Sequence, residues 1–286
     1  MIRQNFNADW TVEKGDGNSR MNSFLGNTQT KTVHLPYDAM IHEARTPDTK
    51  NGAQTGFYPG GEYIFQKHFT APQAWQGKPV SLVFEGVYQT ALVYLNGWLL
   101  TRNVNGYAEF TVEAGPYLKY GADNLLKVIA DNSLEPNSRW YTGSGIYRPV
   151  RLLVGNKVYL PQDTVRITTR EADEGFALLD VTAQVQSAST VTERVTLQQT
   201  ICREGTAVLT DRQNLLLQPG ESRTVSFRYC VDSPALWSPE NPNLYTSTMQ
   251  VLEGEEELDR EETSFGIRTL SIDAAHGVRI NGQTVK

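Results

Sequence analysis

The richest set of chemistry-bearing side chains runs from Ser138 to Arg148, as Ser-Arg-Trp-Tyr-Thr-Gly-Ser-Gly-Ile-Tyr-Arg. Aromatic faces beside polar donors suit a sugar, because its C–H face stacks on the ring while its hydroxyls bond to Asn, Asp or Arg. The segment has neither the helix nor the strand period, which predicts a loop, and its two glycines permit turns that gather these side chains. The residue types alone favour sugar binding and packing in a seam between domains equally.

The candidate substrate-binding residues are Arg139, Trp140, Tyr141, Ser138 and Asp131. Arg139 comes early in the loop and is the better candidate for facing a ligand. Arg148 directly precedes an apolar run that ends in Val154, so we expect it to be a structural anchor.

The sequence lacks the motifs of phosphate-binding, zinc-binding and serine-nucleophile sites. There is no Gly-rich phosphate loop, no Cys or His pairing with zinc spacing and no Gly-x-Ser-x-Gly elbow, and the four histidines are scattered. We therefore expect no metal and no cofactor, and the residue types assign no catalytic group.

Composition narrows the class of protein. A length of 286 residues favours two domains, and a net charge of −6 argues against a nucleic-acid or anionic-membrane partner. No apolar run approaches the roughly 20 residues of a membrane span, and the first residues lack the apolar centre of a signal peptide. A cytoplasmic location is the expectation, although a trimmed chain would look the same. Cys202 and Cys230 fall on the polar side of their strand patterns, which predicts free thiols.

Short alternating runs dominate the elements that must position the loop. They predict strands at 80–84, 91–95, 98–100, 125–130 and 150–154, with Asn96-Gly97 as a hairpin turn. Near residue 158 the composition changes, and the strands predicted after it are rich in Thr, Val and Gln: 164–169, 176–186, 191–202, 207–217 and 222–231. Strands ending near Leu252 and Ile267 follow, with an acidic turn at 253–257 between them. Seven or so strands in this length fit an immunoglobulin-like sandwich.

Several motifs, in order, resemble the N-terminal region of glycoside hydrolase family 2. They are Val33–Asp38, Phe84–Tyr88, Val93–Gly97, Asn105–Tyr107, Ser138–Arg148, Trp237–Tyr245 and Phe265–Thr269. The resemblance is to the β-galactosidase-like branch. It implies an all-β fold, with a jelly-roll galactose-binding-like sandwich at 1–158 followed by an immunoglobulin-like β-sandwich at 159–272. Residues 273–286 would open a (β/α)₈ barrel that is absent from the chain.

The resemblance implies the N-terminal, non-catalytic part of a retaining β-glycosidase. Both catalytic glutamates would then lie beyond Lys286, and the chain alone would be inactive. The implied partners are a carbohydrate substrate and the catalytic barrel of the same polypeptide, and a homo-oligomer is left open. The Asn281-Gly282 hairpin stops just after its return strand begins, which suggests a piece of a longer protein.

Some galactosidase and glucuronidase branches carry an Asp, which contacts the glycone, at the position aligned with Arg139. An arginine there can bond ring hydroxyls or a uronate carboxylate, so the resemblance leaves the glycone open. Two other readings also stay open. The chain can be a stand-alone carbohydrate-binding module, or a scaffold without a ligand.

Overall fold

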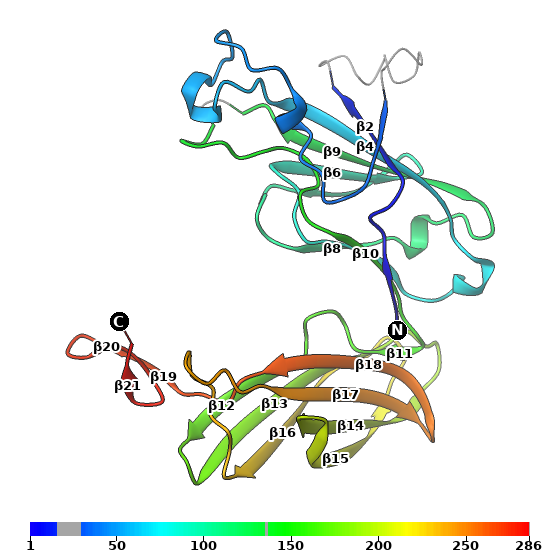
Figure 1. Cartoon of the computed structure of the whole chain (residues 1–286). Coiled ribbons are helices and arrows are strands. Elements are labelled where there is room, and N and C mark those ends of the chain that lie inside the picture. The colour runs from blue at the N-terminus through cyan, green and yellow to red at the C-terminus, as the bar shows by residue number, and fades with distance from the viewer. Residues whose placement is uncertain (16–29, 135–136, 286) are drawn as a thin grey trace. The chain divides into compact units, whose positions relative to one another are not determined.

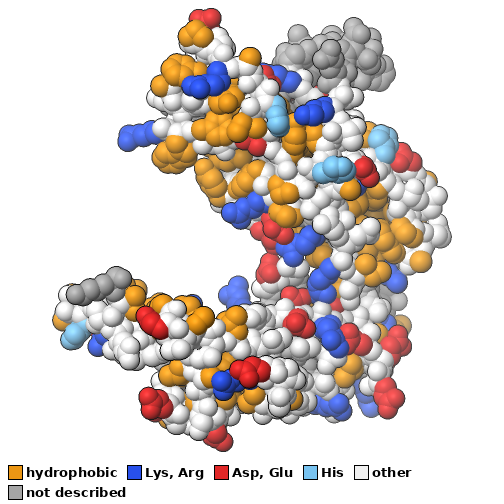
Figure 2. All heavy atoms as spheres, in the orientation of Figure 1, with side chains coloured by type: hydrophobic (Ala, Val, Ile, Leu, Met, Phe, Trp, Pro, Cys, Tyr) orange, Lys and Arg blue, Asp and Glu red, His pale blue; other side chains and the backbone are white. Residues whose placement is uncertain are grey.

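The computed structural model describes residues 1–15, 30–134 and 137–285, which form two compact units (Figure 1). The first is Ile2–Val154, and the second is Gly155–Lys286 together with Met1. Each unit has its own core of buried apolar side chains. On the face shown in Figure 2, basic and acidic side chains are interspersed on both units.

The first unit is a jelly-roll sandwich of two antiparallel sheets. One sheet has the order β1-β10-β5-β8 and the other the order β3-β2-β4-β9-β6-β7. The strands are β1 (Ile2–Asn5), β2 (Trp10–Lys14), β3 (Lys31–Val33), β4 (Gly61–Thr70), β5 (Val80–Phe84), β6 (Thr90–Leu95), β7 (Trp98–Asn103), β8 (Phe110–Glu113), β9 (Asp123–Asn132) and β10 (Val150–Val154).

The second unit is an immunoglobulin-like sandwich. In one sheet β11, β12 and β16 pair with β13, and the other has the order β15-β14-β17-β18. A three-stranded hairpin sheet, β19-β20-β21, follows. The strands are β11 (Val158–Tyr159), β12 (Arg166–Ala172), β13 (Phe176–Ser187), β14 (Glu193–Arg203), β15 (Thr206–Leu217), β16 (Ser222–Asp232), β17 (Tyr245–Glu253), β18 (Glu256–Phe265), β19 (Leu270–Asp273), β20 (Gly277–Ile280) and β21 (Gln283–Thr284).

Period-two alternation explains why these segments form half-buried strands. Along β13, the side chains of Ala177, Leu179, Val181, Ala183 and Val185 are buried, and the residues between them are partly exposed. Successive side chains of a strand point to opposite faces, so this pattern places one face on the core. The prediction of an all-β fold with two successive sandwiches is confirmed.

Turn chemistry accounts for the hairpins. Asn96-Gly97 has positive φ at both residues, 51° and 89°, and connects β6 to β7 as predicted. The turn expected over 253–257 is shorter, because β17 runs to Glu253 and β18 begins at Glu256. Gly254, with φ of 61°, reverses the chain within two residues. Both cysteines are free thiols, as predicted.

The described helices are four 3-10 turns: η1 (Met40–His42), η2 (Gly52–Thr55), η3 (Gln73–Trp75) and η4 (Gly115–Tyr117). None of these described helices has the length and hydropathy required to cross a bilayer. The first of them, η1, follows the segment that holds the Ser138–Arg148 loop.

Candidate functional site

The loop Ser138–Arg148 lies in the first unit, in the irregular segment between β9 and β10 (Figure 1). Its last part is fixed by backbone pairing on two sides. Tyr37 N donates to Ile146 O and Ala39 N to Ser144 O, both at 2.8 Å. On the other side Tyr88 and Gly145 exchange two backbone hydrogen bonds of 3.0 and 3.1 Å. The loop is therefore built into the sandwich although it has no regular secondary structure of its own.

The two loop glycines are required by these close approaches. Gly145 has φ of 140°, and a Cβ there would lie 2.6 Å from the carbonyl oxygen of Tyr37. Gly143 has φ of 72°, and its Cβ would lie 2.8 Å from a carboxylate oxygen of Asp38. Side chains other than hydrogen are excluded at both positions by backbone conformation and by space.

Asp38 connects the loop to the segment before η1 by hydrogen bonds. Its Oδ2 accepts a 2.6 Å hydrogen bond from the hydroxyl of Tyr141. Its Oδ1 accepts from the backbone N–H groups of Ser144, at 3.0 Å, and Met40, at 3.1 Å. Three donors on one carboxylate satisfy most of its acceptor capacity.

Tyr141 is consequently turned into the unit. Its half-buried ring packs against the core and lies 5.1 Å from the ring of Tyr58. Burial, and then the hydrogen bond to Asp38, raise the pKa of Tyr141 far above the ordinary value, so the phenol stays protonated. Its hydroxyl donates its hydrogen bond to Asp38.

Asn132, at the end of β9, is hydrogen-bonded to the same loop. Its side-chain nitrogen donates to Gly143 O at 3.0 Å and to the hydroxyl of Thr142 at 3.3 Å. Its side-chain oxygen accepts from Nδ2 of Asn137 at 2.8 Å. Asn132 is 1% exposed and its bond to Gly143 O is buried, which strengthens its hold on the loop.

Arg139 and Trp140 lie at the surface of this pinned loop. Trp140 is 63% exposed, and Arg139 is also exposed. Within the described part of the chain, the Arg139 side chain makes no hydrogen bond or ion pair. An indole face and a free guanidinium on neighbouring residues can stack on a sugar ring and bond to its oxygens.

The remaining candidates have local partners. The half-buried Asp131 accepts from the backbone N–H of Ser133 at 2.9 Å and from its hydroxyl at 2.6 Å. The backbone N–H of Ser138 donates to Oδ1 of Asn137 at 2.8 Å. Both residues adjoin the loop, but these bonds give them turn-forming roles that the residue types did not indicate.

The far end of the loop is held to a neighbouring turn. The hydroxyl of Tyr147 donates to Gly106 O at 2.8 Å, and the guanidinium of Arg148 lies 5.6 Å from the Tyr147 ring centroid. Tyr107, beside Gly106, is 59% exposed, and its ring lies 5.3 Å from that of Tyr88. Arg148 is itself exposed and rests on the Tyr147 ring, so its role as an anchor stays a prediction.

Sequence reasoning missed the two residues that hold the loop, Asp38 and Asn132. The signals for both were weak. Asp38 ends the motif Val33–Asp38, which carries part of the family resemblance, and Asn132 directly follows the candidate Asp131. A carboxylate or amide shows its partners only after the chain has brought them together.

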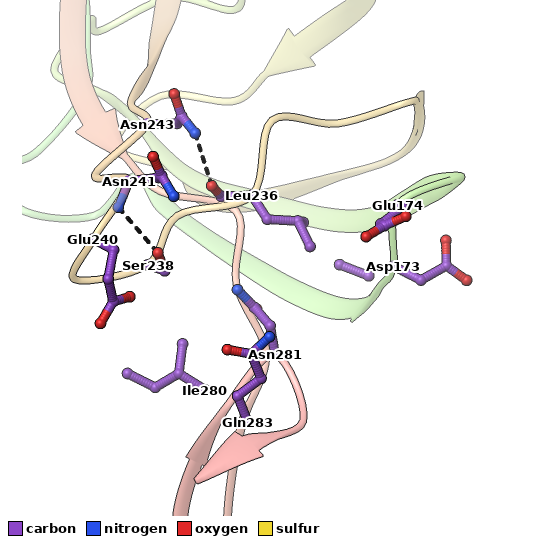
Figure 3. A pocket seen from close by; sticks show the side chains of 11 residues that line it. Asp173, Glu174, Leu236, Ser238, Glu240, Asn241, Asn243, Ile280, Asn281 and Gln283 are labelled. Carbon is purple, nitrogen blue, oxygen red and sulfur yellow. Dashed lines mark hydrogen bonds between the residues drawn. The ribbon is translucent and has the colours of Figure 1, made fainter. Parts of the chain in front are cut away.

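The second unit contains a polar cavity of about 600 Å³ (Figure 3). The turn between β12 and β13, the loop after β16 and the β20–β21 turn line it, with Asp173, Glu174 and Glu240 as its carboxylates. Oδ1 of Asp173 already accepts from the N–H groups of Gly175 and Phe176. Across the described ranges, no three His, Cys, Asp or Glu side chains are grouped to hold a metal ion.

Family models match both units. The galactose-binding domain-like model of glycosyl hydrolase 2 matches residues 10–177, and the model described as glycosyl hydrolases family 2 matches residues 158–268. The first unit is thus galactose-binding-like, as predicted.

Similar proteins are known by sequence and by structure. The β-galactosidase BoGH2A of Bacteroides ovatus is 34% identical over 99% of this chain and 34% of its own length. A β-glucuronidase of Formosa agariphila is 26% identical over 99% of this chain and 31% of its length. A family 2 glycosyl hydrolase from Bacteroides cellulosilyticus superposes with a TM-score of 0.90 at 29% identity, over all of this chain and 38% of that one.

The chain spans about a third of the length of these curated relatives and covers their N-terminal part. One family model covers more than half of the chain, and a second continues from it through the immunoglobulin-like unit. The chain belongs to glycosyl hydrolases family 2.

Proposed function

We propose that this chain is the non-catalytic N-terminal part of a retaining β-glycosidase and that its Ser138–Arg148 loop borders the active site. The substrate would be a β-galactoside or a β-glucuronide. The observation that carries the proposal is the pinned loop that leaves Trp140 and Arg139 open to solvent. Stacking on Trp140 and hydrogen bonds from Arg139 would hold the glycone while a catalytic domain supplies the two carboxylates.

The β19–β20 hairpin supports a catalytic domain in the same polypeptide. Leu270 and Ile272 pair with Ile280 and Val278, so the four side chains share one face. Leu270 is 63% exposed, Ile272 72% and Val278 41%. An exposed apolar face on so small a sheet favours a covering partner, and we assign that role to the barrel of the longer protein. A stand-alone sugar-binding module would have no use for this face.

Activity measurements test the non-catalytic role. Purified chain incubated with 4-nitrophenyl β-galactoside or 4-nitrophenyl β-glucuronide should release no nitrophenol above a buffer control. Turnover that persists through repeated purification and disappears when a carboxylate of this chain is replaced would contradict the proposal. Translation of the coding sequence beyond Lys286 separates the glycosidase from the stand-alone module.

Sugar binding tests the loop. In an NMR titration of the chain with methyl β-galactoside and methyl β-glucuronide, Arg139→Ala should weaken binding of the glycone by roughly tenfold, the value of one charged hydrogen bond. Arg139→Lys keeps the charge but loses the planar fork, so it should restore binding of the glucuronide better than binding of the galactoside. Arg102→Ala, at another exposed arginine of the same unit, is the matched control. Equal affinities in Arg139→Ala and the unchanged chain would remove Arg139 from the site.

A further inference from the structure

The carboxylate of Asp38 lies where two segments far apart in sequence meet. Backbone hydrogen bonds pair Tyr37 and Ala39 with Ile146 and Ser144, so residue 38 lies between two paired positions. From there its side chain reaches Tyr141, which is 103 residues away in the sequence. One oxygen accepts a hydrogen bond from the phenol, and the other accepts from two backbone N–H groups.

This arrangement divides the loop side chains into two groups. Tyr141 points into the unit, where its ring packs against Tyr58 and its hydroxyl donates a hydrogen bond to Asp38. It can therefore offer a ligand no hydrogen-bond donor while Asp38 is in place. Arg139 and Trp140 precede this anchor directly and remain at the surface. Tyr141 therefore helps to set the position of Arg139 and Trp140, and Asp38 acts on them through Tyr141.

The loop has little other support between Ser138 and Tyr141. Asn132 acts on Thr142 and Gly143, and the backbone pairing begins at Ser144. Among the described residues, the only side-chain hydrogen bond of Tyr141 is the one to Asp38. That bond, together with the packing of the Tyr141 ring on Tyr58, therefore restrains the part of the loop that carries the candidate ligand-facing residues.

We propose that Asp38 is a positioning residue: by holding Tyr141 and Ser144 it fixes where Arg139 and Trp140 present themselves to a sugar. The ligand part of this inference rests on the proposed function. The structural part, that Asp38 determines the order of residues 139–144, stands on the geometry of the chain itself.

Three substitutions in the whole chain separate the bonds of Asp38. Asp38→Ala removes all three, and Tyr141→Phe removes only the phenol bond. In Asp38→Asn the side-chain oxygen can still accept from Met40 and Ser144, while its NH₂ group faces the phenol oxygen and reverses the direction of that bond. Asp123→Ala is the matched control, because Asp123 pairs with His68 at an exposed site at the opposite end of β9 from Asn132.

The first readout is amide hydrogen exchange with the Trp140 indole NMR signal, assigned with Trp140→Phe. In Asp38→Ala, amides 139–144 should exchange at least roughly tenfold faster, and the indole signal should move toward that of a free tryptophan. Tyr141→Phe should produce the indole change but keep the Ser144 amide protected. Asp38→Asn should lie between Tyr141→Phe and the unchanged chain, and exchange in β12–β18 should not change in any variant.

The second readout is affinity for methyl β-galactoside and methyl β-glucuronide. A misplaced contact pair should cost roughly tenfold to a hundredfold in Asp38→Ala and less in Asp38→Asn, which is the rescue that a positioning role predicts. Unchanged exchange and an unchanged indole signal in Asp38→Ala would overturn the proposal. So would a loosened loop that binds sugar as well as before.

The experiment also covers a variant that does not fold and a chain that binds no sugar. If Asp38→Ala does not fold, Tyr141→Phe and Asp38→Asn decide the question, because each alters a single contact of the carboxylate. If the unchanged chain binds neither sugar, that result counts against the proposed function. The exchange and indole measurements still decide whether Asp38 positions the loop.

Discussion

At the scale of single residues, the loop separates anchoring side chains from presented ones. Trp140 and Tyr141 are adjacent aromatic residues, and their residue types alone predict the same role for both. In the structure Tyr141 is a half-buried anchor bonded to Asp38, and Trp140 is 63% exposed. A substitution at the first should change the shape of the site, whereas one at the second should change its contacts.

Gly143→Ala tests how tightly the loop is held. Gly143 has φ of 72°, and a Cβ would meet the Asp38 carboxylate at 2.8 Å, so we expect a loss of roughly 2–4 kcal/mol from strain and displacement of Asp38. Gly56→Ala is the control, because Gly56 has φ of 65° in the same unit but its nearest contact would be an ordinary 3.7 Å. It should lose only about 1 kcal/mol. Urea unfolding measures both, and equal losses would show that the Asp38 contact adds nothing.

At the scale of elements, long-range polar contacts join strands of the second unit. The ammonium of Lys157, just before β11, lies 3.0 Å from Glu193 and 2.7 Å from Glu253. Glu193 begins β14, and Glu253 ends β17. Only 8% of the Glu193 side chain is exposed, so its charge depends on these partners.

This contact predicts an acid-sensitive second unit. A hydrogen bond from Ser189 and then one from Lys157 lower the pKa of Glu193 below its ordinary 4.5. A depressed carboxyl pKa adds stability that is complete above about pH 4.5 and disappears as the pH falls through the folded-state value. Glu193→Gln should therefore lower stability at pH 7 and flatten its dependence on pH below 4.5.

Urea midpoints of the second unit between pH 3 and pH 7 measure this effect. Glu204→Gln is the control, because the Glu204 side chain is 83% exposed. A pH dependence in Glu193→Gln as steep as that of the unchanged chain would assign the acid sensitivity to other carboxylates.

At the scale of the whole molecule, the chain consists of two units with separate cores. Leu179 on β13 is fully buried in the second core. Leu179→Ala should cost roughly 2–5 kcal/mol through lost burial and the cavity left behind. Hydrogen exchange should record the loss in β12–β18, and the protection of β4, β6 and β9 should stay unchanged. A matching loss in the first unit would show that the two fold as one.

Much of the architecture follows from local patterns. Alternation along β13 and the Asn96-Gly97 turn predict their elements because strand faces and positive-φ turns depend on neighbouring residues. Strands β1 to β4 were not predicted. Their mixed runs, such as the exposed Ile2–Asn5, form strands through long-range pairing: β1 pairs with β10, β4 with β9, β2 with β4, and β3 with β2.

The amino-acid sequence by itself determined the all-β class, the order of two sandwiches and the loop with the best composition for a sugar. The tertiary structure alone decided which side chains of that loop are anchored and which are presented. The physical reason is the distance along the chain. Tyr141 and Asp38 are 103 residues apart, and only the pairing of Tyr37 and Ala39 with Ile146 and Ser144 brings the carboxylate to the phenol.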